Sequence, residues 1–226
     1  GFMLGEHNWW AKNKMPLYNE ISHIPLFIYH PDYKQNIGQR RSVVTQNIDL
    51  MPTFLENHKI KIPKEVQGKS LLNFLEKEEK TNYSALFGYW GGGVNITDGN
   101  HTYFNYPKYM NRADPYQYTL MPTHLRQFFT LNELKTAKME KPFNFTKGVP
   151  IMKIQNDDRG PSIGNDDSFK KGFIDTDSAL YDIINDPGQI NKIEDRDIIK
   201  KMNNLIFDKM KKNDAPKEVI SRFFKN

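Results

Sequence analysis

Two short runs on either side of Asp98-Gly99 constrain the fold more than any other feature of the chain. Val94 to Thr97 alternates apolar and polar residues before the dipeptide, and His101 to Tyr106 forms the run after it. Asp-Gly between such runs predicts a β-hairpin, because glycine adopts the left-handed backbone of a tight turn without steric cost. Ser84 to Trp90, bounded by three glycines, supplies a further strand. The second half of the chain is therefore expected to form an antiparallel sheet.

A helical pattern near the C-terminal end of the chain predicts what covers this sheet. Apolar residues at helical spacing, with lysine and aspartate on the other face, predict an amphipathic helix over residues 193–212. The apolar positions are Ile198, Ile199, Met202, Leu205, Ile206 and Met210. One face of this helix is expected to pack on the antiparallel sheet.

Three further elements are predicted from local signals. The nearly continuous apolar run from Ile24 to Tyr29 is typical of a buried strand in a mixed or parallel sheet. A helix is expected over residues 48–57, and another over Leu131–Met139, where Thr130 and Glu133 form a capping box. The pattern combines helices and strands and therefore predicts an α/β fold.

Composition excludes several classes of function. The 226 residues contain 38% apolar residues and no run long enough to cross a membrane, so no membrane association is expected. The absence of cysteine excludes disulfides, thiolate metal sites and a cysteine nucleophile. The net charge of +5 is spread over interleaved lysines and acids without a basic stripe, which argues against nucleic-acid binding.

Five motifs, in this order along the chain, carry a family resemblance. They are Gly1–Lys12 (GFMLGEHNWWAK), Ser22–Pro31 (SHIPLFIYHP), Asn47–Leu55 (NIDLMPTFL), Gly68–Leu72 (GKSLL) and Ala179–Gly188 (ALYDIINDPG). Together they resemble the C-terminal portion of sulfatases of the alkaline-phosphatase superfamily, with iduronate sulfatases and their bacterial relatives most similar in motif. Residues between the fourth and fifth motifs are much less covered by the resemblance.

The resemblance implies a division of the chain into two parts. Residues 1–75 would form the end of the catalytic α/β domain, with the tail of the metal loop, the strand 24–29 and the helix 48–57. Residues 76–226 would form a smaller C-terminal subdomain, in which the antiparallel sheet packs on the terminal helix. Residues 107–178 are expected to hold variable, family-specific loops.

The resemblance also implies a chemistry, namely hydrolysis of a sulfate monoester with calcium and a formylglycine nucleophile. In the family a metal-binding Asp-His or Asp-Asn pair stands directly before the glycine that corresponds to Gly1, and nothing in this chain resembles the formylglycine motif. We therefore expect no metal ligands here, and we expect the nucleophile and most calcium ligands in an N-terminal part of the same sulfatase. This chain alone is predicted to be inactive.

The loop of the first motif holds the candidate site residues. Lys12 matches the position where many sulfatases place a lysine on the sulfate, and an ammonium with three donors suits a reorienting oxyanion; Lys14 is the rival position. His7 is either a substrate contact or a residue that holds the loop through hydrogen bonds to backbone. Trp10 would line the site with an aromatic face, or would pack under the loop.

A second pair of candidates lies in the variable region. His124 and Arg126 are hypothesised to reach the rim of the pocket and select the leaving group. The alternative is two surface residues at a turn into a helix. None of the histidines beyond the first loop shows metal-ligand spacing.

Two alternatives to a sulfatase remain open from the sequence. Phosphonate and phosphodiester hydrolases share much of the scaffold and also place a lysine in this loop, and a catalytically inert binding fragment would need no nucleophile at all. On the preferred interpretation, the partners are a sulfated small molecule or sugar and the N-terminal part of the enzyme. The compartment is not predicted.

Overall fold

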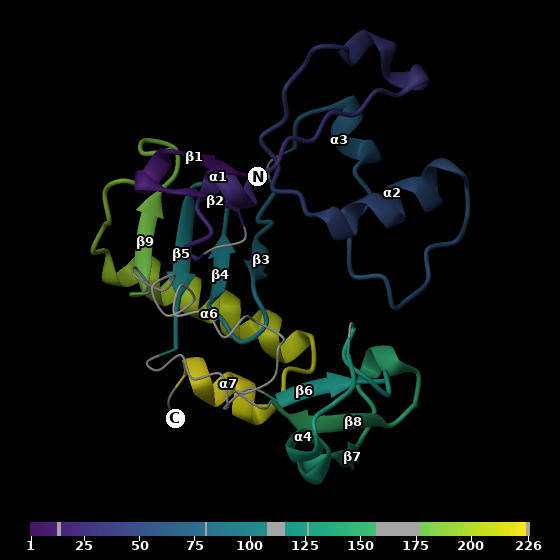
Figure 1. Cartoon of the computed structure of the whole chain (residues 1–226). Helices are drawn as coiled ribbons and strands as arrows, with labels where there is room; N and C mark the ends of the chain where they lie inside the picture. Colours follow the sequence, from purple (N-terminus) through teal and green to yellow (C-terminus); the bar gives the residue numbers. More distant parts are fainter. Residues whose placement is uncertain (13–14, 80, 108–115, 126, 157–176, 225–226) are drawn as a thin grey trace.

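The computed structural model describes residues 1–12, 15–79, 81–107, 116–125, 127–156 and 177–224 (Figure 1). The strands are β1 (Met3–Leu4), β2 (Trp10–Ala11), β3 (Ala85–Gly88), β4 (Val94–Thr97), β5 (His101–Asn105), β6 (Tyr116–Thr119), β7 (Lys138–Glu140), β8 (Ile151–Gln155) and β9 (Ala179–Asp182). The α-helices are α1 (Asn19–Ser22), α2 (Leu50–Asn57), α3 (Leu72–Glu76), α4 (Leu131–Thr136), α6 (Arg196–Lys212) and α7 (Lys217–Phe223). Short 3-10 turns are η1 (Glu6–Asn8), η2 (Pro31–Asn36), η3 (Asn47–Asp49) and η4 (Asn144–Thr146).

The predicted antiparallel sheet is confirmed, with strand order β3-β4-β5-β9. Thr97 pairs with Thr102, so a turn from Asp98 to His101 joins β4 to β5. Gly99 has a φ of 90°, which is the conformation that the Asp-Gly signal requires. The strand β9 pairs with β5 and completes the sheet from a distant part of the sequence.

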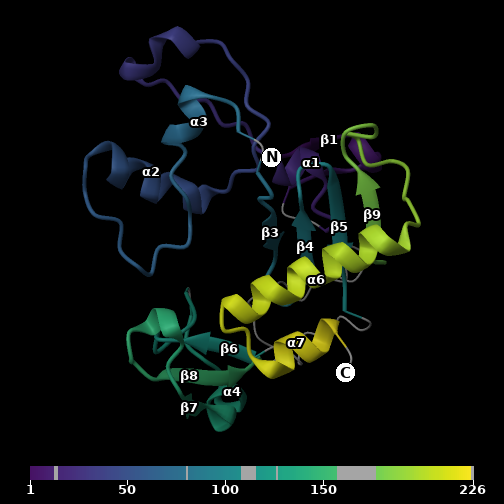
Figure 2. The ribbon, with the colours of Figure 1, turned by 180° about the vertical axis from the view of Figure 1, so that it is seen from behind.

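The helix α6 covers one face of this sheet, as predicted. Figure 2 shows α6 crossing the strands. Alternate strand residues point toward it, because successive side chains of a strand leave on opposite faces. The core on this face consists of Ile96, Tyr103 and Leu180 from the strands and Met202, Ile206 and Met210 from α6. The helix begins after Asp195, whose carboxylate accepts hydrogen bonds from the first helical N–H groups.

The N-terminal segment covers the opposite face of the same sheet. Phe104 and Tyr181 point toward this segment and share a core with Met3, Leu17 and Tyr18. Residues 1–12 and 15–22 therefore form one outer layer of the sheet, and α6 forms the other. The expected division of the chain at residue 75 remains a prediction.

The predicted strand over Ile24–Tyr29 is wrong. These residues form no strand, and the side chain of Phe27 is 93% exposed. A strand needs a neighbour for its N–H and C=O groups, and among the described residues none of the three sheets places a strand beside this segment. The predicted α/β fold class is confirmed, and every sheet in the described part of the chain is antiparallel.

The helix predicted over residues 48–57 is confirmed as η3 followed by α2. The buried carboxylate of Asp49 accepts hydrogen bonds from the backbone N–H of Gln46 at 2.7 Å and from that of Lys69 at 2.8 Å. It thereby joins the start of the helix to the Gly68-Lys69-Ser70 segment. In both views α2 and α3 stand to one side of the main sheet (Figures 1 and 2).

A second sheet lies in the region expected to hold variable loops and one helix. Its strand order is β6-β8-β7, and α4 packs on β8. The capping box of Thr130 and Glu133 is confirmed, but the helix ends at Thr136 instead of Met139. Residues 138–140 leave the helix because they pair with β8. None of the helices in the described part of the chain combines the length and apolar character that a bilayer crossing requires.

Candidate functional site

The first motif folds into a small hairpin. Met3 pairs with Ala11 and Leu4 with Trp10. Gly5 has a φ of 124°, which favours glycine, and its N–H donates to the carbonyl of Trp9 at 2.9 Å. Met3 is 1% exposed and anchors the hairpin in the core. The loop is therefore held by the sheet that it covers.

The carboxylate of Glu6 is used inside this hairpin. It accepts a hydrogen bond from the backbone N–H of Leu4 at 2.6 Å. Hydrogen bonds from its own N–H and from that of Leu4 lower the pKa of Glu6. Glu6 thus stabilises the turn, and this use of its oxygens argues against a role in proton transfer.

His7 is fixed by a ring contact. Its imidazole stacks on Tyr18 with ring centroids 3.6 Å apart and planes inclined by 2°. The backbone of His7 lies in the left-handed region, with a φ of 51°. Its Nε2 atom is buried and has no hydrogen-bond partner among the described residues. The stacking, and not a hydrogen bond from Nε2 to backbone, holds the ring.

Trp10 and Lys12 lie on the outer side of the hairpin. Trp10 is 75% exposed and stands opposite Leu4, which is also exposed. Lys12 directly follows β2 and is exposed. Within the described residues, no hydrogen bond or ion pair holds its ammonium group. The structure therefore brings His7, Trp10 and Lys12 together on one loop, and Lys12 can meet an anion there.

His124 belongs to a different part of the molecule. Its Nε2 lies 3.0 Å from both carboxylate oxygens of Glu133, which is 1% exposed, and its ring tilts against Phe129 at 4.4 Å. In both views α4 lies at the opposite end of the molecule from the β1–β2 hairpin (Figures 1 and 2). The structure does not bring His124 to the loop of Lys12. Arg126 lies outside the described residues.

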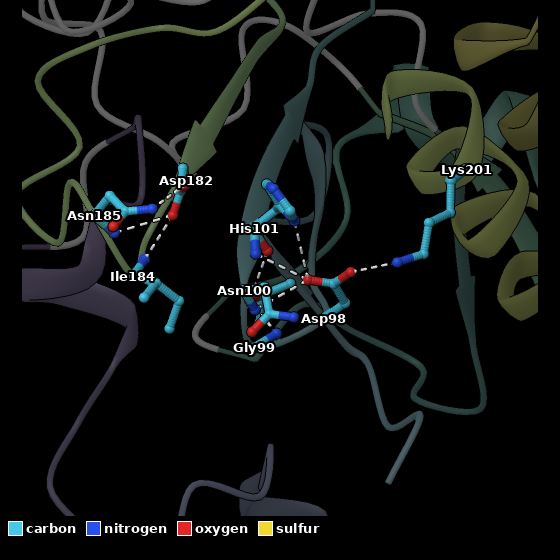
Figure 3. Close-up of polar contacts among 9 residues, drawn as sticks. Asp98, Gly99, Asn100, His101, Asp182, Ile184, Asn185 and Lys201 are labelled. Carbon is cyan, nitrogen blue, oxygen red and sulfur yellow. Dashed lines mark hydrogen bonds and ion pairs between the residues drawn. The ribbon is translucent and has the colours of Figure 1, made fainter. Parts of the chain in front are cut away.

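A cluster of charged residues at the β4–β5 turn is a second candidate (Figure 3). Asp98 accepts hydrogen bonds from the N–H of His101 at 2.8 Å and from the ammonium of Lys201 at 2.7 Å. Asp182 accepts from backbone N–H groups and from the amide of Asn185. Burial opposes ionisation of Asp98, but these hydrogen bonds outweigh it and lower its pKa.

The turn cluster is structural. Its carboxylates are occupied by local N–H groups and by Lys201, which links the turn to α6. Among the described residues, no three His, Asp or Glu side chains converge so as to hold a metal ion.

The sequence did not predict that the turn Tyr89–Gly93 lies near the Lys12 loop. The turn Tyr89–Gly93 between β3 and β4 contacts Met15, because a Cβ placed on Gly92 would lie 2.7 Å from the Met15 sulfur. The run of three glycines was interpreted only as a strand boundary. Three glycines in a row indicate close packing against another segment, but the sequence alone does not show that this segment contains Met15.

Comparisons with known proteins agree with the motifs. Residues 5–95 match the family described as N-sulphoglucosamine sulphohydrolase, C-terminal. An N-acetylglucosamine-6-O-sulfatase of Bacteroides thetaiotaomicron is 41% identical over 81 residues, which is 36% of this chain and 14% of that protein. An arylsulfatase of Clostridium perfringens is 35% identical over 103 residues, or 45% of this chain and 20% of that protein.

Residues 5–95 are therefore similar to the C-terminal region of sulfatases. The fold is similar to that of a solved structure described as a complex with its substrate D-glucosamine-2-N,6-O-disulfate. The two chains superpose with a TM-score of 0.57 at 18% sequence identity, and the match covers 100% of this chain and 34% of the other. The matched segments thus span only a minor part of each relative. The matched relatives are sulfatases, which does not favour the phosphonate or phosphodiester alternative. None of these matches tests the closer similarity to iduronate sulfatases, which remains a prediction.

Proposed function

We propose that the protein to which this sulfatase region belongs hydrolyses a sulfate monoester of a sugar. The observation that carries the proposal is the match of residues 5–95 to a sulfatase C-terminal family, a stretch that contains Lys12. Two named relatives support the substrate class, since one is an N-acetylglucosamine-6-O-sulfatase and another is described in complex with a disulfated glucosamine.

Lys12 is the residue of this chain that binds the sulfate in our proposal. Its ammonium is exposed at the end of a rigid hairpin and can donate to the peripheral oxygens as negative charge develops on them. Trp10 lies two residues away, and its exposed indole would border the group that carries the sulfate.

His7 acts as a positioning residue. Its ring lies on Tyr18 and its Nε2 atom is buried, whereas Trp10 and Lys12 are exposed. By stacking on Tyr18, His7 fixes the path of the hairpin that presents Lys12. The contrasting role, a direct substrate contact, is tested by variants described in the Discussion.

Calcium and formylglycine are the usual cofactors of the family, and we propose that both are supplied from the N-terminal part of the same protein. The cation would polarise the sulfuryl oxygens, and the formylglycine would provide the nucleophile. The residues of this chain would hold and orient the ester.

The same N-terminal part is the proposed partner of residues 24–29. Phe27 is 93% exposed and Tyr29 is 70% exposed, which is unusual for an apolar run. The exposed apolar residues of α2, Met51 and Phe54, would add to this contact. A stable, monodisperse monomer formed by residues 1–226 alone would contradict this assignment.

Sulfate release by the full-length protein tests the activity. We expect calcium-dependent turnover of N-acetylglucosamine 6-sulfate and of 4-nitrophenyl sulfate, and mass spectrometry is expected to find formylglycine. Faster turnover of a phenyl phosphonate ester than of either sulfate would instead assign the protein to the phosphonate hydrolases.

A further inference from the structure

The turn between β3 and β4 is built so that it can carry only two large side chains. It spans five residues, because Gly88 pairs with Val94. A Cβ at Gly88 would lie 2.4 Å from the carbonyl oxygen of Gly93, and a Cβ at Gly93 would lie 2.8 Å from the ring of Tyr106. Gly91 has a φ of 78°, which disfavours any other residue. Tyr89 and Trp90 are the two side chains left.

These two side chains differ in burial. Tyr89 packs against the core beneath the N-terminal segment, and its hydroxyl is buried. Trp90 is 49% exposed. An indole half exposed beside a half-buried tyrosine offers an apolar face to a ligand.

Two contacts fix the turn. The guanidinium of Arg222 on α7 donates from Nη2 to the carbonyl oxygen of Gly91 at 2.9 Å. On its other side Gly92 lies against Met15, three residues after Lys12. The turn that carries Trp90 therefore contacts Met15, which stands three residues after the lysine that binds sulfate in the proposed function.

We propose that Trp90 is a specificity-determining residue that stacks on the sugar ring of the substrate while Lys12 holds its sulfate. This inference rests on the proposed function and deepens it. A pyranose ring has an apolar face of C–H groups, and a rigid indole is suited to such a face because little side-chain entropy is lost on binding. The ligand class is a sulfated saccharide, in contrast to a small aryl sulfate.

Steady-state kinetics of the full-length enzyme on N-acetylglucosamine 6-sulfate tests the inference. Trp90→Ala is expected to raise KM about tenfold, as the loss of one aromatic contact implies. Trp90→Phe keeps an aromatic face and is expected to stay within about threefold of the parent enzyme. Phe128→Ala, which removes another exposed aromatic side chain from the 116–155 region, is the matched control and should change nothing.

Inhibition by inorganic sulfate distinguishes stacking of Trp90 on the sugar from an indirect effect of the substitution on the Lys12 loop. If Trp90 contacts only the sugar, the inhibition constant for sulfate is the same in the parent enzyme and in Trp90→Ala. A parallel loss of sulfate inhibition would overturn the inference, because the turn would then act by supporting Lys12. An unchanged KM in Trp90→Ala would also overturn it while leaving the proposed function intact. A parent enzyme that cleaves no sulfated sugar would contradict both.

Discussion

The imidazole ring of His7 lies flat on the phenol ring of Tyr18, with centroids 3.6 Å apart and planes 2° from parallel. Tyr18 is 5% exposed and in turn meets Phe104 of β5 edge to face at 5.5 Å. A chain of aromatic contacts thus connects the hairpin of Lys12 to the centre of the main sheet.

Two substitutions of His7 distinguish the stacking of its ring from the polar contacts of its nitrogen atoms. His7→Ala is expected to lower the free energy of unfolding by about 1 kcal/mol through loss of the stacked pair, and to reduce kcat/KM because the hairpin loosens. His7→Phe keeps a stacking ring and should restore both, since the Nε2 atom has no hydrogen-bond partner in the described part of the chain. Thermal unfolding and kinetics of the full-length enzyme check this. If His7→Phe is as impaired in kcat/KM as His7→Ala, the imidazole contacts the substrate directly.

Lys12→Met should lower kcat/KM by about 100-fold or more, because one preorganised donor to a charged transition state is removed. Its melting temperature should stay unchanged, since the side chain is exposed. Lys34→Met removes another exposed lysine and serves as control. Full activity of Lys12→Met on sulfate esters would remove Lys12 from the site and favour Lys14, which lies outside the described residues.

The Asp98 cluster predicts a specific pH dependence of stability. The folded-state pKa of Asp98 lies below its ordinary value of 3.8, because hydrogen bonds from Lys201 and backbone N–H groups outweigh its burial. Its contribution is therefore fully present above pH 3.8 and is lost as the pH falls through the lower folded-state value. Asp98→Ala should be less stable by about 1–3 kcal/mol at pH 7, since several hydrogen bonds to a charged group disappear.

Denaturant unfolding at several pH values checks this prediction. The difference between parent and Asp98→Ala should shrink as the pH falls below 3.8. Lys201→Met should cost less than 1 kcal/mol, roughly the value of an exposed ion pair. A difference that stays constant down to acid pH would mean that the carboxylate charge is not what stabilises the turn.

Glu218 on α7 connects the last helix to the second sheet. It contacts the ammonium of Lys153 on β8 and accepts a hydrogen bond from the hydroxyl of Tyr118 on β6. Burial, followed by the hydrogen bond to Glu218, raises the pKa of Tyr118 to about 12. Burial opposes ionisation of Glu218 itself, but its hydrogen bonds from Lys153 and Tyr118 prevail and lower its pKa.

Glu218→Gln should therefore loosen the second sheet without unfolding the first. We expect a loss of about 1 kcal/mol and amide exchange in β6 and β8 that is roughly fivefold faster. Exchange in β4 and β5 is the internal control. Since the folded-state pKa of Glu218 is depressed, the effect should be present above pH 4.5 and fade as the pH falls through that lower value. Uniform exchange changes in both sheets would contradict the local role.

Local signals in the sequence were sufficient for several elements of the fold. The turn at Asp98-Gly99, the capping box of Thr130 and Glu133, and the apolar stripe of α6 each depend on neighbours within a few residues, so the pattern that forms them is visible along the chain. The motif order likewise predicted the similarity to sulfatases that the family match over residues 5–95 supports.

Only the tertiary structure decided which distant residues meet. The segment Ile24–Tyr29 has the composition of a strand, but it forms none because no described strand lies beside it. The strands β6, β7 and β8 form a sheet although their local sequence patterns are weak. His124 turned out to pair with Glu133, and Met15 to support the turn of Trp90. Strand pairing and side-chain contacts of this kind are fixed by long-range packing, which one-dimensional periodicity does not encode.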